Sequence, residues 1–407
     1  MTLIRVGFLP LLDAAILIAA HEVGFASGQG IELQLVRETS WANIRDRVSV
    51  GQFDMAHMLA PLPVAQNLGL SPLKVPLIAP FALGLGGNAI TVSNDLFRAM
   101  GGFGADRTGD PRRAGQALHA VVKARQAKGE PPLTLAVVHD YSGHAYELRY
   151  WLAACGVNPS RDVAVTIVPP PLMSDALASG AIDGYCVGEP WNSVSAALAV
   201  GSVVTTKAAI WQSSPEKVLG LRQSWAEANP EVLGRLLLAL HHAASWCADA
   251  KNLDVLASIL AREAYVGVSA EILLRGLTGA VLGGLVQADF LLFAARAANF
   301  PWKSHALWYY SQMVRWGQLR FSDERARVAF DTYRPDLYRQ ALRQHGVALP
   351  GASSKVEGAL RETNYVPAAG GRMALGPDGF FDRVIFDPDD VEAYVRGSPF
   401  YDAVHND

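Results

Sequence analysis

The feature that most constrains this chain is a short apolar segment that runs into a proline. Residues 182–187 are mostly apolar and are flanked by Gly180 and Gly188, which predicts a strand buried in a parallel sheet. Pro190 cannot donate a ladder hydrogen bond, so the strand has to end before it. In open α/β sheets, ligands lie just beyond the carboxyl ends of the strands. We therefore expect the loop at 188–192 to face a ligand site.

Two side chains of this loop allow two interpretations. Trp191 and Glu189 are a large aromatic and a carboxylate placed where a ligand would lie. The alternative is that Trp191 packs a domain interface and that Glu189 caps a helix or forms a structural pair. Both interpretations leave the position of the loop unchanged.

Predicted strands and helices alternate along the first half of the chain, which is typical of a parallel-sheet α/β fold. Apart from the segment above, the predicted strands are 2–10, 31–37, 54–59, 75–83, 88–93, 133–139 and 163–168. The predicted helices are 13–23, 41–50, 111–128, 142–155, 172–179, 230–251, 254–264, 269–279 and 305–316. Asp13 is expected to cap the first helix. From about residue 215 the chain is mostly helical.

This order predicts two α/β lobes with a ligand cleft between them. Lobe I is expected to comprise residues 1–87 together with 206–407, which add extra C-terminal helices. Lobe II is expected to comprise residues 88–205. Two crossovers between the lobes form a hinge, and loops at the strand ends of both lobes face the cleft.

Composition and charge exclude several classes of function. The net charge of −3 leaves no basic field for nucleic acid and no polybasic membrane patch. No stretch reaches the ~18 uncharged apolar residues that a membrane-spanning helix needs. The three cysteines, Cys155, Cys186 and Cys247, fit neither a Cys-x-x-Cys metal site nor a disulfide framework. We expect Cys186 and Cys247 to be ordinary buried thiols, and we predict no metal and no cofactor.

The start of the chain carries a prediction about location. A strand is predicted from residue 2 onward, and no small-residue cleavage site follows a charged start. We therefore expect that the chain as written is not exported and is cytoplasmic.

The polar residues at the predicted strand ends are mostly hydrogen-bond donors. No nucleophile elbow, Walker loop, dinucleotide fingerprint or His-Glu-x-x-His motif is present. Instead, Trp41, Asn88, His144 and Lys217 follow strands or lie at lobe crossovers, and His144 opens a helix whose dipole favours an anion. These donors suit a small anion that has only acceptors. Each residue alone has an ordinary explanation, such as a core tryptophan, a solvated lysine or a helix cap.

Several segments resemble the nitrate and bicarbonate solute-binding proteins of bacterial ABC importers. They are 87–93, 148–154, 169–173, 215–220, 304–308 and 183–192, which contains the specific run Gly-Glu-Pro-Trp-Asn. The resemblance covers most of the chain, from residue 3 to about residue 320 and more weakly beyond. It implies an α/β type II periplasmic-binding-protein fold with two lobes and a ligand cleft.

The resemblance also implies a set of ligand-binding residues. In the nitrate-binding members a Trp, a Gln, a His and a Lys hold the anion, and these fall on Trp41, Asn88, His144 and Lys217. Pro170, in the matching proline segment, is expected with them. Asn88 departs from the family pattern because its side chain is one methylene shorter than glutamine, so its amide keeps the donor but reaches less far.

Within this family the chain looks like the cytoplasmic nitrate/nitrite sensor. That sensor holds an RNA-binding antiterminator protein inactive until the anion binds. The expected partners are therefore nitrate or nitrite and an antiterminator protein, with no direct contact to nucleic acid or membrane. The first alternative is the solute-binding subunit of a nitrate or bicarbonate ABC importer. The second is an enzyme like the thiamine-pyrimidine synthases, which use a cysteine-rich motif and lysine-bound pyridoxal phosphate.

Lys217 is central to the expected mechanism. We expect it to supply the only full positive charge on the anion, which favours a metal-free monovalent anion over bicarbonate with calcium. Closing the cleft without an anion would bury this ammonium with no counter-charge, which is costly. The protein is therefore expected to rest open and to close on the anion.

Overall fold

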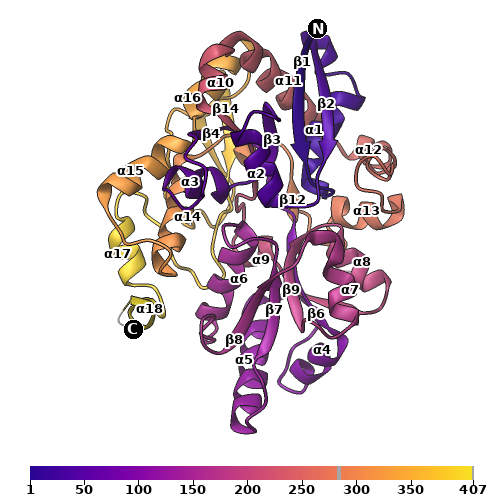
Figure 1. Cartoon of the computed structure of the whole chain (residues 1–407), viewed down its shortest axis with the longest axis vertical. Coiled ribbons are helices and arrows are strands. Elements are labelled where there is room, and N and C mark those ends of the chain that lie inside the picture. Colours follow the sequence, from indigo (N-terminus) through magenta and orange to yellow (C-terminus); the bar gives the residue numbers. More distant parts are fainter. Residues whose placement is uncertain (282–285, 406–407) are drawn as a thin grey trace.

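The chain folds into two lobes stacked along its long axis (Figure 1). The computed structural model describes residues 1–281 and 286–405. Each lobe contains a sheet of five strands, and helices cover both sheets. Within the described residues, no helix is both long enough and apolar enough to cross a membrane.

The sheet of lobe I has the order β2-β1-β3-β11-β4. Its strands are β1 (Thr2–Phe8), β2 (Ile31–Arg37), β3 (Met55–Leu59), β4 (Leu77–Ala82) and β11 (Lys217–Arg222). Strand β1 pairs in parallel with β2 and β3, whereas β11 runs antiparallel to β3 and β4. The register places Lys217 opposite Leu59, so the first residue of β11 lies beside the last residue of β3.

The sheet of lobe II has the order β10-β6-β9-β7-β8. Its strands are β6 (Asn88–Ser93), β7 (Leu133–Val137), β8 (Val163–Ile167), β9 (Gly184–Gly188) and β10 (Gly201–Thr206). Strand β7 is parallel to β8 and β9, whereas β6 is antiparallel to β9 and β10. Asn88, the first residue of β6, pairs with Gly188, the last residue of β9.

The prediction of parallel sheets is therefore wrong for the strands that cross between the lobes. A chain that arrives from the other lobe enters the sheet at the edge that faces that lobe. Strands β6 and β11 enter in this way, so they run opposite to the strands whose carboxyl ends point at the same edge. As a result Asn88 and Lys217 begin their strands at the junction of the two lobes. The predicted lobe boundaries at 87/88 and 205/206 stay a prediction.

Helices fill the connections and form most of the C-terminal part. They are α1 (Ala15–Glu22), α2 (Trp41–Ser49), α3 (Pro61–Asn67), α4 (Asn94–Gly101), α5 (Pro111–Ala127), α6 (Gly143–Ala154), α7 (Met173–Ala178), α8 (Trp191–Ala197), α9 (Lys207–Ile210), α10 (Gln223–Ala228), α11 (Pro230–Ala248), α12 (Leu253–Leu260), α13 (Ala270–Thr278), α14 (Lys303–Arg315), α15 (Asp323–Thr332), α16 (Pro335–Leu342), α17 (Val391–Arg396) and α18 (Tyr401–His405). Two short pairings, β5 (Leu85–Gly86) with β12 (Leu291–Leu292) and β13 (Asn364–Ala368) with β14 (Gly371–Leu375), complete the fold.

The predicted helix cap at Asp13 is wrong. Residues Leu12–Ala14 form a 3₁₀ turn, α1 begins after it at Ala15, and no side chain caps either element. Asp13 is buried within this turn. A buried carboxylate needs a charged or hydrogen-bonding partner, and the site described below supplies it.

The C-terminal segment packs against both lobes. Phe380 stacks on Trp211, with ring centroids 4.6 Å apart, and lies 5.3 Å from the ring of Tyr150 on α6. The Tyr150 hydroxyl donates to the carboxylate of Asp382 at 2.8 Å. One hydrophobic cluster runs without a break from lobe I through lobe II to Trp308 on α14. The lobes are therefore joined by aromatic packing as well as by the crossovers.

Replacing Phe380 by alanine tests this aromatic junction. The ring is 2% exposed, so its removal leaves a cavity between Trp211 and Tyr150. The Phe380→Ala variant is expected to lose about 3–5 kcal/mol of unfolding free energy. Urea denaturation measures this loss, and Phe103→Ala, whose ring is 53% exposed, serves as the matched control. Equal stability of the two variants would show that the packing of Phe380 between Trp211 and Tyr150 does not stabilise the fold.

Candidate functional site

Four of the predicted site residues lie at the starts of elements that face the junction of the lobes. Lys217 opens β11 and Asn88 opens β6. Trp41 is the first residue of α2, and His144 is the second residue of α6. The serine before each helix caps it: Ser40 accepts from Asn43 N, and Ser142 accepts from Ala145 N. The local sequence therefore fixes where these two helices begin.

These four side chains are buried, and three of them have unused polar atoms. Trp41 is 2% exposed, Lys217 is 1% exposed, and Asn88 and His144 are fully buried. Within the described residues, Trp41 Nε1, both amide atoms of Asn88 and both ring nitrogens of His144 have no hydrogen-bond partner. Leaving a buried polar group unpaired costs about 1–3 kcal/mol. Native proteins rarely accept this cost, so a cluster of such groups is a candidate place for a ligand.

Contacts connect these residues across the junction. Lys217 Nζ lies 5.3 Å from the centroid of the Trp41 ring. His144 Nδ1 lies 3.4 Å from Glu216 Oε1, the same oxygen that accepts from Lys217. A Cβ added to Gly188 would lie 3.2 Å from Asn88 Oδ1 and 3.7 Å from Asp13 Oδ2. These contacts therefore place Trp41, Asn88, His144 and Lys217 in one buried cluster.

Pro170 is the fifth predicted ligand-binding residue. It is buried and begins a 3₁₀ turn, Pro170–Leu172, in which its carbonyl accepts from Met173 N. Proline has no N–H, so Pro170 can line an anion site but cannot donate to the anion. The role of all five residues as ligand contacts stays a prediction.

Lys217 is held by two carboxylates. Its ammonium donates to Asp13 Oδ2 at 2.8 Å and to Glu216 Oε1 at 2.6 Å. The expectation that closure buries Lys217 with no counter-charge is therefore wrong. The sequence interpretation missed it because Asp13 was assigned to a helix cap and Glu216 was treated only as part of a motif.

A second lysine extends this network. Lys207, the first residue of α9, forms ion pairs with Glu147 Oε1 at 2.7 Å and with Glu216, and donates to the Pro215 carbonyl at 2.6 Å. On the other side, His57 Nε2 lies 2.9 Å from Asp13 Oδ1. Sequence reasoning missed five functional candidates, namely Asp13, His57, Glu147, Lys207 and Glu216. The available signal was ionisable residues inside apolar segments, which indicates buried charges that need partners.

Burial and charge set the protonation of the network. Burial raises the pKa of Asp13, but the Lys217 ammonium and His57 outweigh it and hold that pKa at about 2. Burial also opposes ionisation of Glu216, yet His144 and the ammonium groups of Lys207 and Lys217 keep its pKa well below the usual value. For Glu147, burial dominates and raises the pKa to about 8. At neutral pH the three carboxylates therefore carry two negative charges and one proton.

His144 is neutral in the folded chain. Burial lowers its pKa to about 3. Burial also lowers the pKa of His57 below the ordinary value. A neutral imidazole has one N–H donor and one acceptor nitrogen, so His144 can donate to an anion without adding positive charge.

The loop after β9 packs in the junction of the lobes. Trp191 Nε1 donates to the Pro10 carbonyl at 3.2 Å, and Leu12 N donates to the Glu189 carbonyl at 2.9 Å. Glu189 Oε2 accepts from Ser193 N at 3.2 Å, four residues along α8. These contacts match the structural interpretation of Trp191 and Glu189, in which the loop joins lobe II to lobe I.

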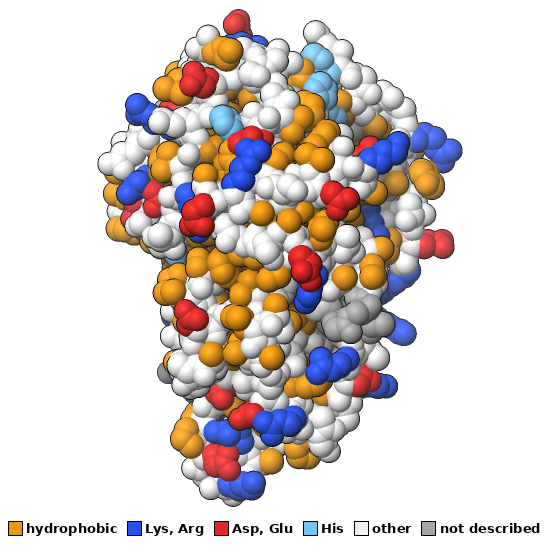
Figure 2. Space-filling view, turned by 90° about the vertical axis from the view of Figure 1, so that its right-hand side faces the viewer, with side chains coloured by type: hydrophobic (Ala, Val, Ile, Leu, Met, Phe, Trp, Pro, Cys, Tyr) orange, Lys and Arg blue, Asp and Glu red, His pale blue; other side chains and the backbone are white. Residues whose placement is uncertain are grey.

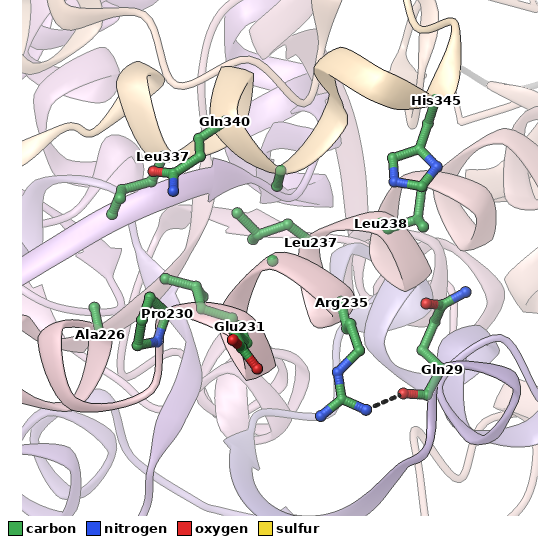
Figure 3. Close-up of a pocket in the computed structure, with 13 residues that line it drawn as sticks. Gln29, Ala226, Pro230, Glu231, Arg235, Leu237, Leu238, Leu337, Gln340 and His345 are labelled. Carbon is green, nitrogen blue, oxygen red and sulfur yellow. Dashed lines mark hydrogen bonds between the residues drawn. The ribbon is translucent and has the colours of Figure 1, made fainter.

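A separate pocket lies on the surface of lobe I, between α11 and α16 (Figure 3). It has a volume of about 420 Å³, and Gln29, Arg235, Gln340 and His345 are among its polar lining residues. Arg235 already donates to the Gln29 carbonyl at 2.7 Å. None of the predicted site residues lines this pocket.

The cysteines in the described part of the chain are free thiols, and its possible metal ligands do not gather into a cluster. Cys155, Cys186 and Cys247 are all free and buried, which confirms the prediction for Cys186 and Cys247. Burial raises the pKa of Cys155 to about 12 and that of Cys186 well above the ordinary value. No group of three or more His, Cys, Asp or Glu residues suited to a metal is found among the residues described.

Comparison with known proteins identifies related sequences. Residues 1–261 match the NMT1-like family. The nitrate/nitrite binding protein NrtA of Synechococcus elongatus is 33% identical over 410 residues, which cover 98% of this chain and 86% of that protein. The nitrate import ATP-binding protein NrtC of Synechocystis is 35% identical over 96% of this chain, which spans only 54% of NrtC.

Solved structures support the same relationship. The crystal structure of the periplasmic nitrate-binding protein NrtA from Synechocystis matches with a TM-score of 0.84 and 27% identity, covering 98% of each chain. The predicted two-lobe periplasmic-binding-protein fold is confirmed. The predicted similarity to nitrate-binding solute-binding proteins is confirmed as well.

The neutral state of His144 predicts an acid-sensitive stability. Its folded pKa of about 3 lies below the ordinary value of 6.5. As pH falls below 6.5, the unfolded chain binds a proton that the folded chain excludes, so stability declines toward pH 3. Between pH 7 and pH 5 this amounts to about 2 kcal/mol. In urea unfolding, the free energy of unfolding of His144→Gln should change less between pH 7 and pH 5 than that of the wild type, by that amount. An equal change in both proteins would mean that the imidazole titrates normally.

Gly143 predicts a steric test of closure. A Cβ at this position would collide with Glu216 Oε2 and would lie 3.2 Å from Lys207 Nζ. Gly143→Ala is therefore expected to wedge α6 away from the charge network and to enlarge the radius of gyration in small-angle X-ray scattering. Gly234→Ala is the matched control, because Gly234 also lies in a helix and a Cβ there meets nothing within 4 Å. An unchanged radius for Gly143→Ala would show that the junction absorbs a methyl group.

Proposed function

This chain belongs to the NMT1-like family, and on that premise we propose that it binds a small monovalent oxyanion, nitrate or nitrite, between its two lobes. One observation carries the proposal. The buried donors of Trp41, Asn88 and His144 have no acceptor among the described residues and lie in the same buried cluster as the ammonium of Lys217. Nitrate offers three oxygen acceptors and no donor, which complements such a set.

The proposed role is that of the solute-binding subunit of a nitrate ABC importer. The similarity to NrtA over nearly the whole chain supports this role. The two lobes and the burial of the site at their junction suit capture by closure. In this role the partners of the chain would be the permease and the ATPase of the importer.

Bicarbonate is the second candidate ligand. It carries an O–H donor in addition to its acceptors, so it requires an acceptor in the site. Asp13 and Glu216 are acceptors beside Lys217, which favours this candidate. Both carboxylates already receive hydrogen bonds from the ammonium. Trp41, Asn88 and His144 each keep an unpartnered donor that an anion with acceptors only can satisfy, so nitrate and nitrite remain the first proposal.

The cytoplasmic sensor is the finer proposal, and sequence resemblance alone supports it. In this role the chain, located in the cytoplasm, would hold an antiterminator protein until the anion binds. If the anion and the partner bind different states of the lobes, each lowers the affinity of the chain for the other by reciprocal linkage. The sensor and the importer subunit share the same anion site, so ligand binding does not distinguish them.

Calorimetric titration of the purified chain with nitrate, nitrite, bicarbonate and sulfate tests the ligand. Nitrate or nitrite is expected to bind, and sulfate is not. A Trp41→Phe variant retains the ring and removes the indole N–H. It should bind nitrate about 10–100-fold more weakly, because a hydrogen bond to a charged group contributes ~1.5–3 kcal/mol.

Trp211→Phe is the matched control for this titration. Trp211 Nε1 is also buried without a partner, but it lies in the aromatic junction with Phe380 and not beside Lys217. This variant should bind nitrate as the wild type does. Equal weakening in both variants, or no nitrate binding by the wild type, would refute the proposed site.

Co-purification distinguishes the two roles. A sensor retains an antiterminator protein in the absence of nitrate and releases it when nitrate is added, whereas an importer subunit retains no such partner. Trp41→Phe should keep the partner at nitrate concentrations that release it from the wild type. A complex that survives saturating nitrate would eliminate the sensor role.

A further inference from the structure

We propose that Asp13 and Glu216 determine the charge specificity of the site, so that it accepts monovalent anions and rejects divalent oxyanions of similar shape. The inference rests on the proposed anion-binding function and adds the rule by which the site selects its ligand. The two carboxylates come from different segments, the 3₁₀ turn before α1 and the residue before β11. Both bind the ammonium of Lys217.

The geometry of Lys217 leaves one donor for an anion. A lysine ammonium has three N–H groups. Asp13 Oδ2 and Glu216 Oε1 accept two of them, at 2.8 Å and 2.6 Å. The third has no acceptor within the described residues, and the ammonium lies over the Trp41 ring at 5.3 Å. Lys217 is therefore a shared cation with a single hydrogen bond to offer, rather than a free positive charge.

The buried groups around this ammonium balance their charges. Lys207 and Lys217 carry two positive charges, and Asp13 and Glu216 carry two negative charges. Glu147, which pairs with Lys207, retains a proton at neutral pH because burial raises its pKa to about 8. His57 and His144 are neutral because burial lowers the pKa of each. The network is thus neutral before an anion arrives.

A neutral network penalises each negative charge that a ligand brings. A monovalent anion leaves one negative charge, which the donors of Trp41, Asn88 and His144 and the third N–H of Lys217 can solvate. A divalent anion leaves two negative charges at the same place, close to the carboxylates of Asp13 and Glu216. Repulsion between like charges is strong where water is excluded. Removing either carboxylate charge should therefore favour the divalent anion selectively.

Two tetrahedral anions separate charge from shape. Perchlorate and sulfate are similar in shape and differ in charge, so the ratio of their dissociation constants reports charge selection alone. The Asp13→Asn variant keeps an oxygen acceptor for Lys217. Its affinity for sulfate relative to its affinity for perchlorate is expected to rise at least about tenfold over the wild type. Glu216→Gln should shift the ratio in the same direction. Asp95→Asn is the matched control, because it removes the same charge from a side chain that is 85% exposed.

The outcomes distinguish this inference from the proposed function. If the wild type binds nitrate but the ratio of sulfate to perchlorate is unchanged in both Asp13→Asn and Glu216→Gln, charge selection by these carboxylates is overturned. If neither tetrahedral anion binds any variant while nitrate does, shape and not charge excludes sulfate, and the inference is again overturned. If the wild type does not bind nitrate, the proposed function itself fails. Thermal melting confirms that each variant is folded, and Glu216→Gln serves alone if Asp13→Asn does not fold.

Discussion

The buried ammonium of Lys217 is the constraint on which the junction of the lobes depends. A charge removed from water is tolerated only with partners, and the carboxylates of Asp13 and Glu216 meet it at 2.8 Å and 2.6 Å. Glu216 also binds Lys207, which in turn binds Glu147 on α6. Breaking either pair of Lys217 would leave a buried charge with fewer partners, because Asp13 and Glu216 are both ionised. The network therefore ties the start of the chain, α6 and both ends of the return crossover into one unit.

The exposed surface is different, because positive and negative side chains are intermixed over the face shown in Figure 2.

The direction of the crossover strands explains why the site lies where it does. In each sheet most strands end at the junction, as expected for parallel strands. Strands β6 and β11 instead begin there, so Asn88 and Lys217 stand beside the carboxyl ends of β9 and β3. Helix starts at Trp41 and His144 complete the set. Elements from both lobes thus contribute polar groups to one buried cluster.

Much of this arrangement could be predicted from the sequence. Alternating apolar segments revealed most strands and helices of the first half, and the loop after residues 182–187 was correctly placed at a strand end. Strand direction was not predictable, because apolar periodicity carries no information on which end of a sheet a strand enters. The partners of Lys217 were missed for a related reason. Asp13 follows a turn and precedes a helix, which is a typical capping position, and only the folded chain brings it to residue 217.

These contacts change the physical account of closure. Lys217 already has its counter-charges, so an anion is not needed to neutralise it. What closure leaves unmet is the hydrogen bonding of Trp41, Asn88 and His144. At about 1–3 kcal/mol for each unpaired group, three such groups penalise closure without an anion by roughly 3–9 kcal/mol. A swing from mostly open to mostly closed needs about 5.5 kcal/mol, which lies within that range. The aromatic packing of Phe380 and Trp308 on Tyr150 of α6 opposes wide opening, so the balance between these two terms would set how far the lobes separate.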